Sequence, residues 1–247
     1  LSKNVVRVKR PELRYPNNEL GKLGEGWAQF DFTIDETGSP VDFHVVDGLG
    51  APVYSKLAIA GVTTARYEPA ERDGQKVGIN ISDFNVYFQV EGENRAAVHG
   101  VVDMAYETAF KLRKEGKFQE SLDRLRQSFK GSLNLYEQAT LSFGIAISYK
   151  GLGDFGRALV HARRAAANDG IYADRGIRRN AFVLLSELHA RDNNPADALC
   201  SFEVVRRLDP DYQPEPALMS LLDTAKRVLT GDTPVQTEVT LVESERT

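Results

Sequence analysis

The sequence predicts two parts: an α+β N-terminal domain with a three-stranded antiparallel sheet and a helix, followed by an all-α array of helical hairpins. Residues 28–46 and 84–90 alternate between apolar and polar side chains, which is the period-two pattern of half-buried strands. Beyond about residue 99, apolar and small residues recur with a helical period almost to residue 230. This change of period predicts a domain boundary near residue 92.

The first two strands are expected to form an antiparallel hairpin. Apolar side chains occupy alternate positions over residues 28–34 and again over residues 41–45. Gly38 lies between these segments, in a turn where a glycine can adopt a positive φ. Trp27, just before the first strand, is expected to anchor the core or its rim rather than to stack on a ligand.

A helix and a third strand complete the expected α+β domain. Residues 52–66 change to a helical period, with Val53, Leu57 and Gly61 on the face that we expect to be buried. Apolar and polar side chains then alternate over residues 84–90. Asp83 interrupts the alternation, which predicts a bulge or bend there.

Three breaks divide the second part into pairs of helices. They lie at residues 115–118, 152–155 and 193–195, and a last helix at about 218–229 is expected to cap the stack. Aligning the breaks brings small residues into shared columns. Two such columns are Ser121, Ala158 and Ala198, and Ala109, Ala146 and Ser186. Small side chains at fixed places let paired helices approach closely, so we expect stacked hairpins over residues 99–230 and a disordered tail over 231–247.

Composition excludes several classes of protein. Hydrophobic residues make up 42% of the chain and charged residues 27%, as in an ordinary globular protein. No apolar run reaches the ~18–20 residues that a membrane span needs. The net charge is −4, and a basic excess over residues 111–207 is too mild to indicate nucleic acid. That excess could favour an acidic protein partner, but a solvated helical surface is the preferred explanation.

The sequence gives no sign of catalysis or of a metal site. Its histidines, His44, His99, His161 and His189, form no His-x-x-x-His pair, and the sequence contains no nucleophile elbow, phosphate loop or dinucleotide fingerprint. The single cysteine, Cys200, is expected to be a buried small side chain rather than a reactive thiol. We therefore expect a binding protein that is not an enzyme and uses no cofactor.

Short motifs follow one another through the first part of the chain. They are Arg14-Tyr15-Pro16, Gly24-Glu25-Gly26, Asp35-Glu36-Thr37-Gly38, Arg66-Tyr67-Glu68-Pro69 and Asp73-Gly74-Gln75-Lys76-Val77. In this order and spacing, residues 11–91 resemble the C-terminal domain of the TonB family. The resemblance implies a TonB-like domain over residues 1–92 and a periplasmic location. We expect the chain to lack the family's membrane anchor and proline-rich spacer, and we expect a targeting segment to have been removed.

The TonB resemblance also implies a mode of binding. In that family the final strand docks a peptide of an outer-membrane transporter, and an exposed strand edge offers N–H and C=O groups for such pairing. The residues implied for peptide binding here are Asn85, Tyr87 and Gln89, with Arg14 and Tyr15 nearby. The alternative for Tyr15 is a purely structural role in fixing the path of the chain.

Further motifs lie at the turns of the helical part. Gly116-Lys117-Phe118 and Gly153-Asp154-Phe155 occupy two turns, and Leu208-Asp209-Pro210 ends the last pair. Together with the small-residue columns they resemble the tetratricopeptide repeat (TPR) family, with periods longer than that family's 34 residues. The resemblance implies a groove that holds a second protein. Arginines near the repeat junctions are the candidate contacts: Arg163, Arg164, Arg175, Arg178 and Arg179.

The expected function is that of a non-enzymatic adaptor of the cell envelope. It would bind a peptide strand at a sheet edge and a second protein on the helical array, in association with TonB-dependent transport. The alternative is an envelope scaffold that self-associates as a homodimer through the exposed strand edge of the TonB-like domain. Neither hypothesis involves nucleic acid or a membrane span in this chain.

Overall fold

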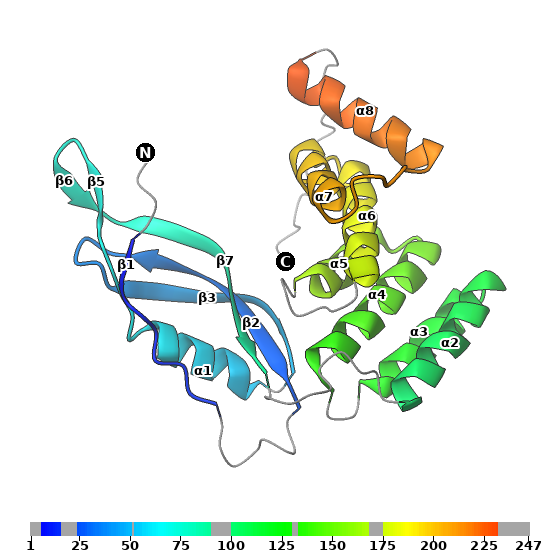
Figure 1. Ribbon diagram of the computed structural model, residues 1–247, viewed down its shortest axis with the longest axis horizontal. Coiled ribbons are helices and arrows are strands. Elements are labelled where there is room, and N and C mark those ends of the chain that lie inside the picture. Colours follow the sequence, from blue (N-terminus) through cyan, green and yellow to red (C-terminus); the bar gives the residue numbers. More distant parts are fainter. Residues whose placement is uncertain are drawn as a thin grey trace, which may run out of the picture.

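The computed structural model describes residues 6–15, 24–50, 52–89, 100–129, 133–167 and 175–231 (Figure 1). A sheet with one helix is followed by a stack of helices, so the predicted fold class is confirmed. The predicted boundary around residues 91–94 and the predicted tail at 232–247 lie outside the described residues, as does the side chain of Arg175.

Three long strands form the sheet. Strand β2 (Gly26–Ile34) lies in the centre and pairs antiparallel with β3 (Pro40–Leu49) on one side and with β7 (Ile79–Phe88) on the other. One face of β2 is fully buried, because Phe30, Phe32 and Ile34 pack into the core. The bulge predicted at Asp83 is present: its φ is 57°, and the β2–β7 register shifts nearby.

Helix α1 (Val53–Val62) covers the buried face of the sheet, but with a different side than expected. Gly61 is buried as predicted, and so are Tyr54 and Ala58. Val53 and Leu57 are only partly buried, so the prediction was wrong by about one residue at these two positions. The cause is Tyr54, whose hydroxyl donates to the carbonyl oxygen of Gly24 at 2.7 Å. The tyrosine ring also lies 4.9 Å from that of Phe88, which fixes the rotation of the helix.

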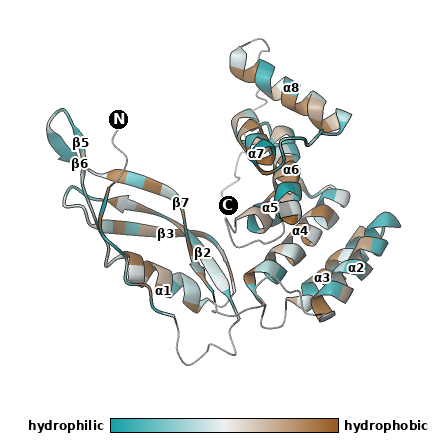
Figure 2. Ribbon diagram, in the orientation of Figure 1, coloured by the Kyte–Doolittle hydropathy of each residue, from teal (hydrophilic) through white to brown (hydrophobic). Residues whose placement is uncertain are grey.

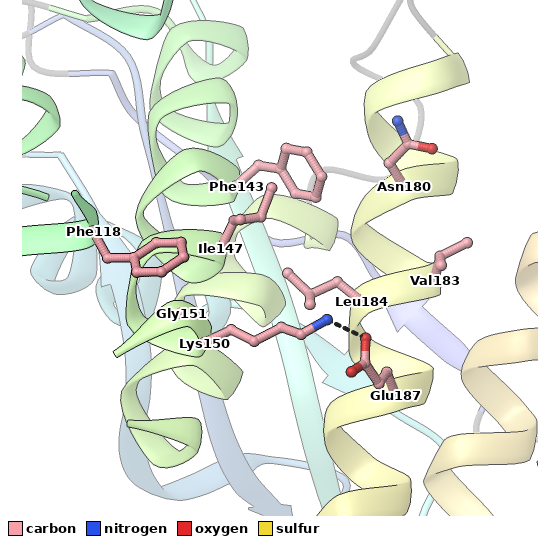
Figure 3. A pocket seen from close by; sticks show the side chains of 9 residues that line it. All are labelled: Phe118, Phe143, Ile147, Lys150, Gly151, Asn180, Val183, Leu184 and Glu187. Carbon is pink, nitrogen blue, oxygen red and sulfur yellow. Dashed lines mark hydrogen bonds and ion pairs between the residues drawn. The ribbon is translucent and has the colours of Figure 1, made fainter. Parts of the chain in front are cut away.

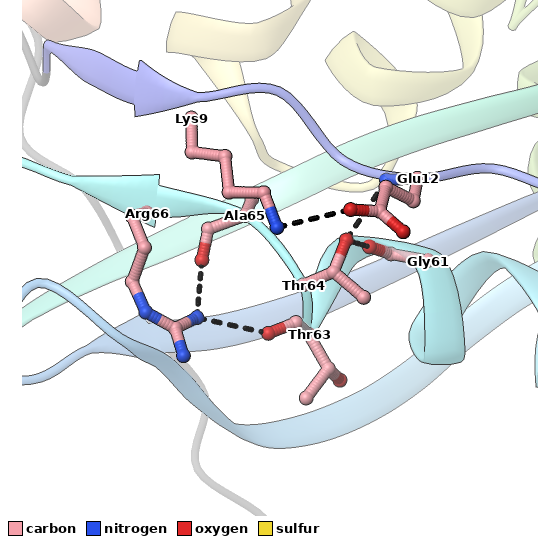
Figure 4. Close-up of polar contacts among 7 residues, drawn as sticks. All are labelled: Lys9, Glu12, Gly61, Thr63, Thr64, Ala65 and Arg66. Carbon is pink, nitrogen blue, oxygen red and sulfur yellow. Dashed lines mark hydrogen bonds and ion pairs between the residues drawn. The ribbon is translucent and has the colours of Figure 1, made fainter.

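Helix α1 ends earlier than its sequence pattern suggests, because side chains replace the next turn of the helix (Figure 4). The hydroxyl of Thr64 donates to the carbonyl oxygen of Gly61 at 2.7 Å and accepts from the backbone N–H of Glu12 at 2.8 Å. Arg66 donates to the carbonyl oxygens of Thr63 and Ala65. These bonds satisfy carbonyl groups that a helix end leaves without intrahelical partners.

Four short strands were not predicted. Strand β1 (Arg7–Lys9) pairs with β4 (Arg66–Tyr67) directly after this helix end. Strands β5 (Ala70–Arg72) and β6 (Gln75–Val77) form a small hairpin that is mostly hydrophilic (Figure 2). Segments of two or three residues are too short to show a period, so only the turn at Asp73-Gly74 could be read from the sequence.

The helical part contains the three expected hairpins and the expected last helix. The first pair is α2 (Gly100–Lys114) with α3 (Phe118–Ser128), and the second is α4 (Leu135–Gly151) with α5 (Phe155–Ala166). The third is α6 (Arg175–Arg191) with α7 (Pro195–Leu208), followed by α8 (Pro216–Thr230). Every member of the two small-residue columns is 0% exposed: Ser121, Ala158, Ala198, Ala109, Ala146 and Ser186. The columns therefore mark the close contacts between helices.

Glu25, immediately before β2, joins the sheet to the start of α4. Its side-chain Oε2 accepts from the backbone N–H of Leu135 at 2.9 Å, and its own N–H donates to the carbonyl oxygen of Leu133 at 2.9 Å. The side chain of Gln138 donates to the carbonyl oxygen of Glu25. A carboxylate at a helix N-terminus pairs with free N–H groups and faces the positive end of the helix dipole. Glu25 is only 6% exposed, which strengthens these interactions.

The other two strands of the sheet also contact the helical array. The guanidinium of Arg164 in α5 binds the carboxylate of Asp47 in β3 through two nitrogens, at 2.8 and 3.0 Å. The hydroxyl of Tyr87 in β7 donates to the carbonyl oxygen of Ala167, just after α5. All three long strands are thus tied to helices α4 and α5.

Two glycines with positive φ provide a matched test of the hairpin turn. Gly38 has φ 81°, and a Cβ placed on it would lie 2.0 Å from the carbonyl oxygen of Tyr67. Gly74 has φ 76° and no neighbouring atom within 4 Å of such a Cβ. We expect Gly74→Ala to cost about 1–2 kcal/mol, because the left-handed conformation is unfavourable for alanine. Gly38→Ala should lower the free energy of unfolding by at least about 1 kcal/mol more, because the new Cβ would overlap the carbonyl oxygen of Tyr67. Urea unfolding measures the free energy of unfolding of both variants, and equal losses in the two would contradict the close packing around Gly38.

The Asp47–Arg164 pair predicts a measurable coupling between the sheet and the helices. Both side chains are largely buried, and the pair is bidentate. A double-mutant cycle with Asp47→Asn and Arg164→Gln should give a coupling energy of about 1–3 kcal/mol in thermal unfolding. The exposed pair Asp154–Arg157 is the control and should give less than about 0.5 kcal/mol. Strict additivity at Asp47 and Arg164 would show that the contact does not form in solution.

Candidate functional site

A groove runs along the first helices of the three hairpins, and we call it the α2–α4–α6 groove. Its central hollow has a volume of about 430 Å³ and lies between α4 and α6 (Figure 3). Phe143 and Ile147 project from α4, and Val183 and Leu184 from α6, so the walls are apolar. Phe118, at the start of α3, closes one side.

A second hollow continues the groove toward α2. Its volume is about 480 Å³, and Tyr106 and Phe110 of α2 line it together with residues that also line the first hollow. The shared residues are Phe118, Phe143, Ile147 and Asn180. Phe110 is exposed although it is a large aromatic side chain. The two hollows form one trough, whose apolar lining suits a segment of another protein.

Charged groups border this apolar trough. Lys150 of α4 pairs with Glu187 of α6 at 2.5 Å, and Glu187 also pairs with Arg191 at 3.0 Å. At the other end Arg113 is buried over the ring of Tyr106, 5.4 Å from its centroid. Burial lowers the pKa of Arg113, and the adjacent Tyr106 partly offsets that effect. The groove can therefore hold an apolar segment and bind polar groups at its borders.

Sequence reasoning did not predict the residues of this groove. Phe143 and Ile147 are four residues apart and lie beside the core stripe of α4. The sequence did contain one signal for these residues. Helix α4 is apolar on more than one face, as expected for a helix that is contacted on two sides. The buried small-residue columns mark only the opposite face of the helix.

The structure separates the residues predicted for peptide binding. Tyr15 packs in the core, where its ring contacts Phe88 and its hydroxyl donates to the carbonyl oxygen of Gly24. Tyr87 is bonded to the helical part, and Asn85 lines a cavity between the sheet and helices α5–α7. Arg14 is exposed, and Gln89 follows the end of β7. Of the described strands, β2 alone pairs with β7, so the implied docking edge is an edge of the sheet.

Most of the arginines predicted for partner binding have internal contacts. Arg164 binds Asp47, and Arg179 binds Asp209 at 2.7 Å and the side chain of Asn180. Arg178 lies over the ring of Phe182, at 5.8 Å from its centroid. Arg163 is exposed and lines the same cavity as Asn85. Arg163 was predicted for partner binding and Asn85 for peptide binding, and the structure places both at one cavity.

Cys200 is exposed on α7, so the expectation that it is buried was wrong. It also lines the cavity between the sheet and the helices. Across the described ranges, no three His, Cys, Asp or Glu side chains gather as a metal site would require. No helix in the described part of the chain has the length and hydropathy of a membrane span.

Comparisons with known proteins match both parts of the chain. A family model for the Gram-negative bacterial TonB protein C-terminal matches residues 11–90. The chain is similar to the Pseudomonas aeruginosa TonB C-terminal domain, at 18% identity, over 38% of this chain and 93% of that chain, with a TM-score of 0.34. No curated protein sequence matches the chain.

Two solved structures align with the helical part. The first TPR domain of human RPAP3 is 18% identical over 53% of this chain and 94% of that chain, with a TM-score of 0.41. PcrH, in complex with the chaperone-binding region of PopD, is 19% identical over 56% of this chain and 96% of that chain, with a TM-score of 0.39. From the family match and the architecture, the chain consists of a TonB C-terminal-like module followed by TPR-like helical hairpins.

Proposed function

We propose that the protein is a non-enzymatic adaptor of the Gram-negative cell envelope and acts in the periplasm. Residues 1–92 would form the TonB-like binding domain and residues 99–230 the domain that holds a second protein. The observation that carries this proposal is the α2–α4–α6 groove, an apolar trough across three hairpins beside a TonB-like module. A partner could bury Phe110, Phe143 and Ile147 there, which would remove apolar surface from water.

The TonB-like module would supply a second contact, made by its backbone. Among the described strands β7 lies at an edge of the sheet, and its outer side can pair with an extended peptide. Tyr87 anchors the last part of β7 to the helices, which would hold the edge in place when a peptide pairs with it. This arrangement supports a role in TonB-dependent transport in which Gln89 and Arg14 lie beside the peptide.

One observation favours the self-associating scaffold as a second candidate. Val45 and Val46 of β3 are 45% and 46% exposed at the opposite edge of the sheet. Exposed apolar residues on an edge strand favour pairing with another strand, including that of a second copy. A homodimer would place two such edges together.

Photo-crosslinking in living cells tests the adaptor hypothesis. We expect benzoylphenylalanine in place of Val183, in the groove, to form a discrete adduct with another envelope protein, because the groove is occupied by a partner. The same substitution of Val160, which is 42% exposed on α5 and outside the groove, is the control and should form none. The crosslinker in place of Gln89 should capture an outer-membrane transporter if β7 is the docking edge.

A charge in the groove provides the matched control for this experiment. Phe110→Glu should reduce the Val183 adduct at least about tenfold, since a carboxylate in an apolar contact is costly. Leu229→Glu changes an exposed apolar residue of α8, outside the groove, and should leave the adduct unchanged. Equal adducts at Val183 and Val160 would refute the groove as a binding site. Adducts only at twice the mass of the chain would favour the scaffold.

A further inference from the structure

Arg113, in the last turn of α2, places a buried cation on the wall of the α2–α4–α6 groove. The residue is only 8% exposed. Its guanidinium lies 5.4 Å from the ring centroid of Tyr106 and 5.9 Å from that of Phe110, and both rings line the hollow beside α2. Its Nη1 also donates to the hydroxyl of Ser121 in α3 at 3.3 Å. The charged group therefore lies between the contact of α2 with α3 and the groove.

No carboxylate pairs with Arg113 within the described part of the chain. Burial lowers the pKa of its guanidinium, and the neighbour that opposes this shift is the phenol of Tyr106 rather than an acid. Glu107 lines the same hollow, but it lies six positions earlier on α2, about 9 Å away along the helix axis. A buried cation without a counter-ion is costly, so an anion bound at Arg113 would stabilise the complex.

Lys114 brings a second cation to the same place. Its Nζ lies 4.9 Å from the ring centroid of Phe110, which is itself 43% exposed. Lys114 is exposed and forms no hydrogen bond or ion pair across the described residues. Two cations thus flank one exposed aromatic ring, where a carboxylate would be attracted by both.

The charged residues along the groove leave its positive charge at the α2 end. Three cations and two carboxylates line the two hollows: Arg113, Lys114 and Lys150, and Glu107 and Glu187. Glu187 is already bonded by both Lys150 and Arg191. Among the cations that line the groove, those without an ion pair in the described ranges are therefore Arg113 and Lys114.

The apolar walls of the groove and these two cations together define the partner. The two hollows share Phe143 and Ile147, so one segment can extend across both. We propose that the groove binds an acidic segment of another protein, with an aspartate or glutamate side chain at Arg113 and Lys114. An apolar side chain of the same segment fills the hollow between α4 and α6. This inference rests on the proposed function and specifies the chemistry of the partner that the groove holds.

Ile147 provides a reporter of binding that needs no added label group in the groove. It lines both hollows, so its δ1-methyl resonance senses a segment in either (Figure 3). The resonance is recorded in full-length protein labelled at isoleucine methyl groups and is assigned by its loss in Ile147→Val. Two pools of dodecapeptides with acetylated N-termini and amidated C-termini are titrated. One carries aspartate and the other asparagine at every third position, with random alanine, leucine, phenylalanine, serine and threonine between.

The aspartate pool is expected to shift the Ile147 resonance at about tenfold lower concentration than the asparagine pool, because only the carboxylate pairs with Arg113. Blocked termini ensure that the carboxylate belongs to a side chain. Arg113→Met should abolish the difference between the pools. Lys111→Met removes an exposed charge of the same helix that does not line the groove, and it should preserve the difference.

A second variant keeps the test decisive if Arg113→Met disturbs the packing of α2. Lys114 is exposed, so Lys114→Met leaves the core intact and should reduce the difference about two- to fivefold. Equal responses to the two pools, unaffected by either variant, overturn this inference and leave the proposed groove standing. No response of Ile147 to either pool also overturns it, and the crosslink at Val183 then decides separately whether the groove holds a partner.

Discussion

The bond between Glu25 and the start of α4 is the constraint on which the arrangement of the two parts depends. Glu25 lies immediately before the central strand and bonds to N–H and C=O groups at a helix N-terminus. Because β2 lies in the middle of the sheet, fixing the residue that precedes it fixes this end of the sheet relative to the helices. The Asp47–Arg164 pair then restricts rotation about that point.

This junction gives the helical array two different faces. Helices α5 to α7 face the sheet and enclose a cavity with it, while α2, α4 and α6 line the apolar α2–α4–α6 groove. A TonB-like module on its own has an edge strand, and a TPR-like array on its own has a groove. Only their fixed contact produces a cavity with Trp27 on one wall and Arg163 on the other.

The sequence predicted what long periodic segments determine. The three strands, the helical hairpins and the fully buried small-residue columns follow from patterns that repeat over five or more residues. Contacts between distant residues could not be predicted. Arg164 and Arg179 were read as surface groups, but their partners are 117 and 30 residues away along the chain. Cys200 followed an apolar helical pattern, yet the cavity beside α7 leaves it exposed.

This junction holds the sheet and the helices in one arrangement. Double electron–electron resonance between two spin labels tests this arrangement. The labels are attached at Glu36→Cys in the β2–β3 turn and at Asp192→Cys between α6 and α7, in a Cys200→Ser background. We predict a single narrow distance distribution that broadens when Glu25→Ala and Asp47→Ala are added. A broad distribution in the parent protein, or one that is unchanged by the two substitutions, would contradict the account.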